Sequence, residues 1–269
     1  MPKQKYIEKF VKKDNICNIC CKETKGLSVD HVPPKACPPV RERCISKLTY
    51  QIVGDRSFGK RFSQSGVQFK TICQKCNNHL GSKYDSQLAD LSHKIQSFVE
   101  TSVHLPDSFE VECFPNAVMR SVLGHILAAK TQTDEVVIDS LIRPCILDEL
   151  VSIPSDIHIF YWIYPYDKII ILRDFAMPAV RGRFNVPGLF NMLKFYPIAF
   201  LIAYELDTYE GLPNLDSFNN LSVTDKGKLT INLRPAKRPN WPEECLGREN
   251  YLLVSRAAND DSVYSLPKK

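Results

Sequence analysis

The stretch Cys73-Gln74-Lys75-Cys76-Asn77-Asn78-His79 decides how this chain of 269 residues is interpreted. A second pair with the same spacing, Cys17-Asn18-Ile19-Cys20, lies upstream, and 52 residues separate the two pairs. Two intervening residues let both thiolates of a pair reach one tetrahedral ion. Four thiolates leave no open coordination position. The sequence therefore predicts a structural zinc ion, itself not catalytic, bound by Cys17, Cys20, Cys73 and Cys76.

The dipeptide Asp30-His31 stands between the two cysteine pairs. Residues 26–32 alternate apolar and polar side chains and end at Pro33-Pro34, which predicts a short strand. Neighbouring side chains on a strand leave opposite faces, so Asp30 and His31 would meet at one site only at a distorted strand or at its end.

Residues 67–72 form a second alternating stretch that leads directly into Cys73. From Asn77 onward, apolar residues recur at steps of three and four: Leu80, Tyr84, Leu88, Leu91, Ile95 and Phe98. This spacing predicts a helix. A shorter amphipathic helix is expected over residues 4–13. Around the cysteine pairs we therefore expect strand, long loop, strand and helix.

The polar residues of this region suit the hydrolysis of a phosphodiester. That reaction needs a base to deprotonate water and a cation to neutralise charge on the phosphate. His31 suits the first role near neutral pH. Asp30 and Asn77 offer the hard oxygen ligands that Mg²⁺ or Mn²⁺ prefers.

The combination of Cys17-x-x-Cys20, Val29-Asp30-His31-Val32-Pro33-Pro34 and Cys73-x-x-Cys76-Asn77-Asn78 resembles the HNH endonuclease family. The resemblance covers about residues 14–95 and implies a ββα-metal module, often with a Cys₄ zinc. It implies His31 as general base, Asp30 and Asn77 as ligands of one catalytic Mg²⁺ or Mn²⁺, and double-stranded DNA as the substrate.

Two departures from the family pattern leave positions open. Leu80 stands where many members have lysine, and the nearest lysine is Lys83. The third family position is therefore open among Asn77, Asn78 and His79, of which Asn77 directly follows Cys76. Residues 35–72 contain no asparagine, so another residue must brace the loop after His31. Asp85 is either a further ligand or a charge on the helix surface.

The first hundred residues are basic, with 18 Lys and Arg against 9 Asp and Glu, whereas the remainder has 17 against 21. A basic segment suggests a polyanionic partner, because clustered cations neutralise phosphates. A solvated basic face is the alternative explanation. Residues 35–66 are expected to be an irregular insertion, which either follows a nucleic-acid backbone or is a mobile surface loop. The proposed DNA contacts are Lys35, Arg41, Arg43, Lys60, Arg61 and Lys83.

The second part of the chain carries no motif with an assigned chemistry. Residues 103–269 are expected to be a second α+β domain after a nuclease domain at 1–102. In this domain we expect strands at 109–113, 156–164, 168–173, 196–206 and 228–234, helices at 116–132 and 139–151, and a tail at 235–267 that is largely loop. Its expected role is target recognition, sensing, or binding of a partner protein or a second copy.

Composition narrows the class of protein. No apolar run approaches the roughly 20 residues that cross a bilayer, and the first residues lack the apolar core of a signal peptide. We therefore expect a cytoplasmic protein, whose ten cysteines do not form a disulfide framework.

Two functions from different classes follow from these observations. The first is a metal-dependent DNA endonuclease, in a nuclease-plus-sensor layout that resembles prokaryotic restriction and anti-phage systems. The alternative is a zinc-stapled nucleic-acid-binding module without catalysis, in which His31 is structural.

Overall fold

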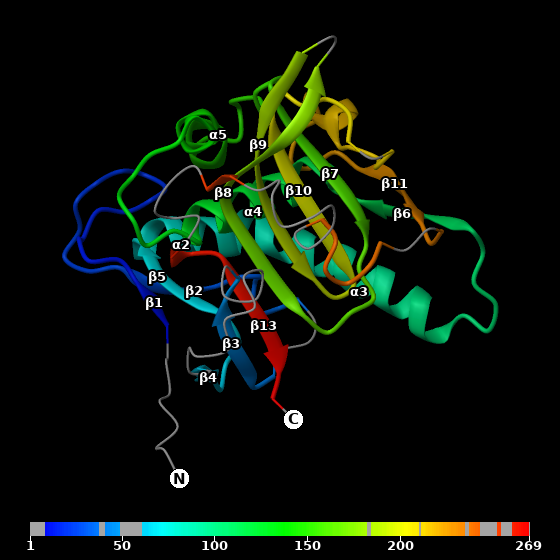
Figure 1. The fold of residues 1–269 in the computed structure, drawn as a ribbon, viewed down its shortest axis with the longest axis horizontal. Helices are drawn as coiled ribbons and strands as arrows, with labels where there is room; N and C mark the ends of the chain where they lie inside the picture. Colours follow the sequence, from blue (N-terminus) through cyan, green and yellow to red (C-terminus); the bar gives the residue numbers. More distant parts are fainter. Residues whose placement is uncertain are drawn as a thin grey trace.

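The structure is a computed structural model that describes residues 9–37, 41–48, 61–181, 184–209, 211–234, 237–242, 252–253 and 260–268. Three sheets and several helices make up the described part (Figure 1). The predicted α+β class is therefore confirmed. Within these residues, no helix combines the length and the apolar character that crossing a membrane requires.

A small three-stranded sheet holds the motif residues. Strand β2 (Ser28–His31) pairs antiparallel with β5 (Gln68–Ile72), and β1 (Phe10–Val11) pairs parallel with β5 on its other side. Helix α2 (Gln74–Leu80) follows β5 directly, and a π-helical turn η1 (Gly81–Asp85) joins it to α3 (Ser86–Thr101). Two strands and a helix thus follow one another as expected, with the insertion of residues 35–66 between the strands.

The helix predicted over residues 4–13 is wrong where the structure describes it. Phe10 and Val11 form strand β1, and the Phe10 ring stacks on Phe69 with the centroids 4.8 Å apart. This packing against β5 overrides the local helical pattern. Residues 1–8 lie outside the described part of the chain.

The larger sheet takes strands from both halves of the sequence. Its order is β4-β3-β13-β8-β9-β10-β7, with β12 paired to β8. These strands are β3 (Arg43–Lys47), β4 (Arg61–Ser63), β7 (Ile157–Ile163), β8 (Ile169–Arg181), β9 (Phe184–Phe195), β10 (Ile198–Tyr204), β12 (Leu252–Leu253) and β13 (Val263–Pro267). The insertion expected to be irregular thus supplies β3 and β4. The tail expected to be loop supplies β13, the strand between β3 and β8.

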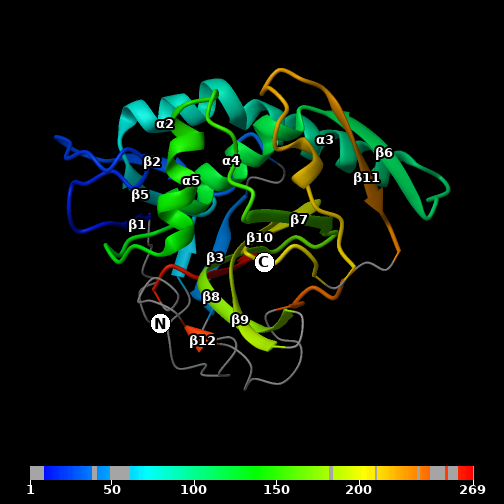
Figure 2. The same ribbon diagram turned by 90° about the horizontal axis from the view of Figure 1, so that it is seen from above.

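Helix α4 (Pro115–Ala128) is the central element, and every one of its residues is buried. It lies over the large sheet and beside α3, with α5 (Val137–Leu147) on its other flank (Figure 2). Two strands, β6 (Ser108–Cys113) and β11 (Gly227–Asn232), form a separate antiparallel pair, and a short 3-10 helix η2 covers Asp216–Phe218.

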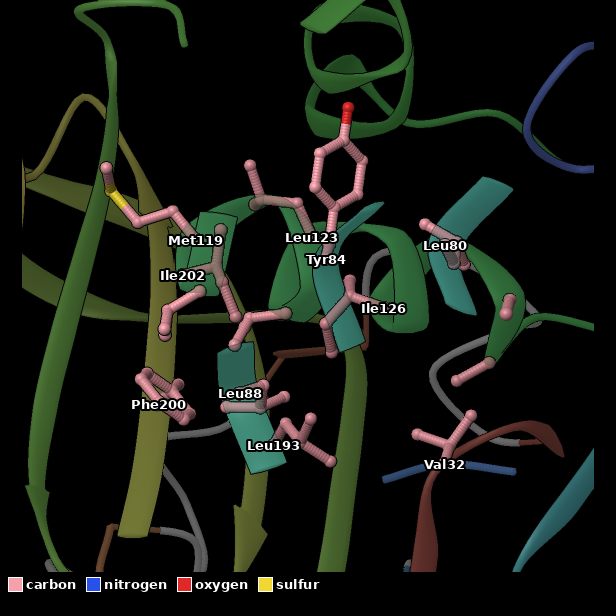
Figure 3. Packing of buried hydrophobic residues seen from close by; sticks show 14 of the residues in the cluster. Val32, Leu80, Tyr84, Leu88, Met119, Leu123, Ile126, Leu193, Phe200 and Ile202 are labelled. Atoms are coloured by element: carbon pink, nitrogen blue, oxygen red, sulfur yellow. The ribbon is translucent and has the colours of Figure 1, made fainter. Parts of the chain in front are cut away.

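One hydrophobic core joins the two halves of the sequence. Leu80, Tyr84 and Leu88 from the motif helices pack around α4 (Figure 3). The same cluster includes Leu193, Phe200 and Ile202 of the large sheet. The proposed division between residues 102 and 103 therefore separates segments that share a sheet and a core.

Candidate functional site

The four predicted zinc ligands converge on one point. The sulfur atoms of Cys17, Cys20, Cys73 and Cys76 all lie within 4.8 Å of one another, and those of Cys20 and Cys73 are 3.9 Å apart. A tetrahedral zinc ion with bonds of about 2.3 Å needs sulfur atoms roughly 3.8 Å apart. The cluster therefore has the ligands and the dimensions to hold a metal ion such as zinc.

Local hydrogen bonds reach two of these sulfur atoms. The Cys73 amide donates to Cys17 Sγ at 3.2 Å, and the Cys76 amide donates to Cys73 Sγ at 3.4 Å. A hydrogen bond from the Cys76 thiol is the largest influence that lowers the pKa of Cys17, to about 4, and the same bond raises the pKa of Cys76. Cys17 is therefore the thiolate of this pair. The cysteines in the described part of the chain are all free of disulfides.

Asp30 and His31 point to different surroundings, as neighbours on a strand do by default. The register of β2 against β5 shifts between Ser28 and Asp30, after which Asp30 pairs with Phe69 and His31 with Gln68. The Asp30 side chain is only 6% exposed and faces α4, whereas His31 is half-buried near the surface. Within the described residues no hydrogen bond joins the two side chains, although the charges of Asp30 and of its partner His125 both act on His31.

His31 has the surroundings of a neutral imidazole. Gln68 Nε2 donates to its Nε2 at 2.8 Å, and the same Gln68 nitrogen donates to Ser65 Oγ at 3.2 Å. Burial is the largest influence on the pKa of His31 and lowers it below 6.5, although the charge of Asp30 acts in the opposite direction. Gln68 thus holds His31 in place, a role for which residues 35–72 offer no asparagine.

A small cavity of about 20 Å³ lies beside His31. Lys35, Ser65 and Gly66 line it together with Val32, Pro33, Pro34, Cys37, Val67 and Ile169. A space of about this size holds one water molecule. The exposed Lys35 adds a positive charge next to it.

Asn77 reaches across from α2 to β2, next to Asp30. Its Nδ2 donates to the Val29 carbonyl at 2.9 Å and to Ser28 Oγ at 3.1 Å. These bonds commit the nitrogen, and within the described residues Oδ1 accepts no hydrogen bond. The remaining oxygen is of the type that Mg²⁺ or Mn²⁺ prefers, so the amide fits a role as ligand.

The other two candidates for the third position are directed elsewhere. Asn78 accepts a hydrogen bond from Gln74 on the exposed side of α2, at 2.7 Å. The His79 ring lies 2.9 Å from the Ile146 carbonyl and meets the edge of Tyr84. Of the three, only Asn77 bonds to β2 in the described structure.

Asp85 is the largest departure from expectation. Its Oδ1 accepts hydrogen bonds from His125 Nε2 at 2.9 Å and from Ser121 Oγ at 2.8 Å. The side chain is 16% exposed, so Asp85 is not a charge on the helix surface. His125 in turn places Nδ1 2.9 Å from Asp30 Oδ2.

The predicted DNA contacts divide in the structure. Lys35, Arg41, Arg61 and Lys83 are exposed, with Arg41 paired to Asp167 and Lys83 to Glu149. Arg43 is fully buried and bonds to Asp167 and Ser265, so it has no surface to offer a nucleic acid and leaves this set. Lys60 lies outside the described residues.

Comparisons with known proteins add no family to this description. No family model matches the chain, and the searches of curated proteins and of solved structures also returned no match.

Proposed function

We propose that this chain is a divalent-metal-dependent DNA endonuclease in which His31 is the general base. The observation that carries the proposal is the arrangement around β2. A base with a lowered pKa adjoins space for one water, and Asn77 is bonded across to the residue before Asp30.

The residues of the chain have separate tasks in this proposal. His31 takes the proton from the attacking water at Nε2, where the water replaces the Gln68 amide as the hydrogen-bond donor, and Lys35 attracts the phosphate. Asp30 and Asn77 hold the divalent ion, which when bound supplies charge neutralisation at the phosphate. Asp30 offers its Oδ1 for this purpose, because Oδ2 is bonded to His125. The four cysteines hold the structural zinc.

The alternative is a zinc-stapled module that binds nucleic acid without cutting it. The observation in its favour is that Asp30 and His31 face different surroundings. The endonuclease in addition gives a role to Asp30 Oδ1 and Asn77 Oδ1, which accept no hydrogen bond within the described residues.

The test is cleavage of supercoiled plasmid by the zinc-loaded protein with Mg²⁺ or Mn²⁺. His31→Ala is expected to lower the cleavage rate by about 10²–10⁴-fold without loss of zinc, since a general base contributes that much. The matched control is His104→Ala, which removes an exposed histidine and leaves the rate unchanged.

A second pair of variants tests the metal ligand. Asn77→Ala is expected to lower the rate at least 10-fold, whereas Asn78→Ala, which loses a bond on the outer side of α2, leaves it unchanged. Salt-sensitive DNA binding without nicking under either ion would support the non-catalytic module instead.

A further inference from the structure

His125 links the central helix to the motif strand. Its imidazole is completely buried on α4 and lies between two carboxylates, those of Asp30 on β2 and Asp85 on η1. Both contacts are 2.9 Å long. The sequence separations are 95 and 40 residues, so the part of the chain after residue 102 delivers this group to the motif region.

Each ring nitrogen of His125 faces a carboxylate. Nδ1 lies 2.9 Å from Asp30 Oδ2, and Nε2 lies 2.9 Å from Asp85 Oδ1. Ser121 Oγ donates to the same Asp85 oxygen at 2.8 Å. Two acidic groups on opposite sides of one buried ring favour the form in which both nitrogens donate.

The geometry fixes the Asp30 carboxylate in one orientation. Asp85, itself held by Ser121, bonds to the far side of the His125 ring, so the ring cannot turn away from Asp30 without breaking a bond that burial makes costly to lose. With Oδ2 committed, Oδ1 is the oxygen left for another partner, and within the described residues no hydrogen bond reaches it. A partner that orients a ligating carboxylate in this way tunes the affinity of a metal site.

We propose that His125 is a positioning residue of the nuclease site, which holds Asp30 in the orientation that binds the divalent ion. The inference rests on the proposed function and extends it, because it makes helix α4 part of the site. Asp85 and Ser121 act through His125. Neither touches the ion or the substrate.

The experiment compares His125→Gln with His158→Gln. His158 also forms a histidine–aspartate pair, with Nδ1 2.7 Å from Asp216 Oδ2, but it contacts neither β2 nor η1 in the described structure. Asp85→Asn provides a second variant that keeps His125 in place. Thermal unfolding and zinc content are measured for each protein, so that a variant that fails to fold is recognised.

Two readouts separate positioning from general stability. The first is the Mg²⁺ concentration that gives half-maximal cleavage, and the second is direct binding of Mn²⁺ followed by electron paramagnetic resonance. His125→Gln is expected to weaken both by about 10–100-fold, with cleavage at saturating metal within a few-fold of the parent protein. Asp85→Asn shifts both in the same direction by a smaller factor, and His158→Gln shifts neither.

The outcomes distinguish this inference from the proposed function. A parent protein that cuts DNA, together with a folded His125→Gln protein of unchanged metal affinity, would overturn the positioning role and leave the nuclease standing. Faster cleavage by His125→Gln would also overturn it, because the contact would then withhold Asp30 from the ion. A parent protein that neither cuts DNA nor binds Mn²⁺ would remove both proposals.

Discussion

Two histidines show how burial and charge act differently on the same side chain. His31 is half-buried with an amide donor on its ring, and burial lowers its pKa below 6.5. His125 is completely buried between two carboxylates, whose charges raise its pKa well above 6.5. At pH 7 the first imidazole is neutral and can accept a proton, whereas the second is charged and can only donate hydrogen bonds.

The pKa of His31 predicts the acid side of the pH profile. A general base works when deprotonated, so cleavage is lost as pH falls through the pKa of His31. The loss is therefore expected at a pH below 6.5. Lys35 lowers this pKa by its charge, so Lys35→Gln should move the loss to higher pH. The measurements are kcat/KM against pH and the NMR titration of the His31 ring.

Lys83→Gln is the control for this shift. It removes an exposed lysine that pairs with Glu149 and is absent from the influences on His31. Two results would contradict the assignment of His31 as the general base. One is a loss of kcat/KM that occurs above pH 6.5 in the parent protein. The other is an equal change, in the two variants, of the pH at which kcat/KM is lost.

The sequence predicted the cluster of four cysteines that could hold a metal ion, but not the partners of Asp30. Cys-x-x-Cys spacing is local, so it identifies the cysteines without knowledge of the fold. His125 lies 95 residues after Asp30, inside a helix that carries no other sign of chemistry, and only the folded chain brings the two together. For the same reason the sequence predicts a DNA contact for Arg43, which in the structure is buried and bonds to the distant residues Asp167 and Ser265.

At the scale of elements, α2 and α4 approach closely at a glycine. A Cβ atom added to Gly124 would lie 2.4 Å from Leu80 Cδ2, and Leu80 is completely buried. Gly81, one residue further along the motif helix, has helical φ and ψ of −59° and −40° and open space around its Cα. A methyl group added to the Cα would therefore clash with Leu80 at Gly124, whereas at Gly81 it would meet no protein atom.

Substitution of these glycines by alanine should have opposite effects on stability. Gly124→Ala is expected to lower the free energy of unfolding by about 1–3 kcal/mol, because a packed core must shift to admit the methyl group. Gly81→Ala is expected to raise it by up to about 1 kcal/mol, since alanine favours the helix and meets no protein atom. Denaturant unfolding of both variants measures the difference.

Gly81→Ala also reports on the substrate. Retained cleavage would show that DNA does not approach the helix backbone at this turn. A loss of cleavage in a stabilised protein would indicate such an approach. A destabilised Gly81→Ala protein would contradict the open space described around this residue.

Helices and strands whose apolar residues recur with a clear period were predicted well. Strands without such a pattern were not. Helices α4 and α5 and strands β6, β7, β10 and β11 lie close to their expected positions. Strand β9 contains Pro187 and Gly188, and β13 ends at Pro267, so both carry residues that usually interrupt a strand. Pairing with β8 decides their structure, and such pairing is not encoded in local periodicity.

At the scale of the whole molecule, the segment 1–102 depends on the rest of the chain. Arg43 bonds to Asp167 and Ser265, and Asn18 donates to the carbonyls of Leu127 and Lys130. Without residues 103–269, Asp30 and Asp85 would lose the His125 side chain that lies between them. Breaking one buried ion pair costs about 3–5 kcal/mol, which is comparable with the roughly 5–15 kcal/mol that stabilises a whole domain.

A fragment of residues 1–102 is therefore expected not to fold cooperatively, even with zinc. Circular dichroism during thermal unfolding and the zinc content of the purified fragment measure this. Co-expression with residues 103–269 should restore one zinc ion and a cooperative transition. An isolated fragment that unfolds cooperatively with one zinc ion would instead support an independent nuclease domain.

The position of β13 between β3 and β8 has a consequence for how the chain is made. Arg43 and its partner Ser265 are 222 residues apart, which a ribosome covers in roughly 10 to 45 s at 5–20 residues per second. Throughout that interval β3 is paired with β4 but lacks its other neighbour, β13, and the guanidinium of Arg43 lacks its final burial. The large sheet is thus complete only after translation has passed residue 267, and a product released early would keep an open edge. Synthesis itself therefore sets the time at which this sheet can be completed.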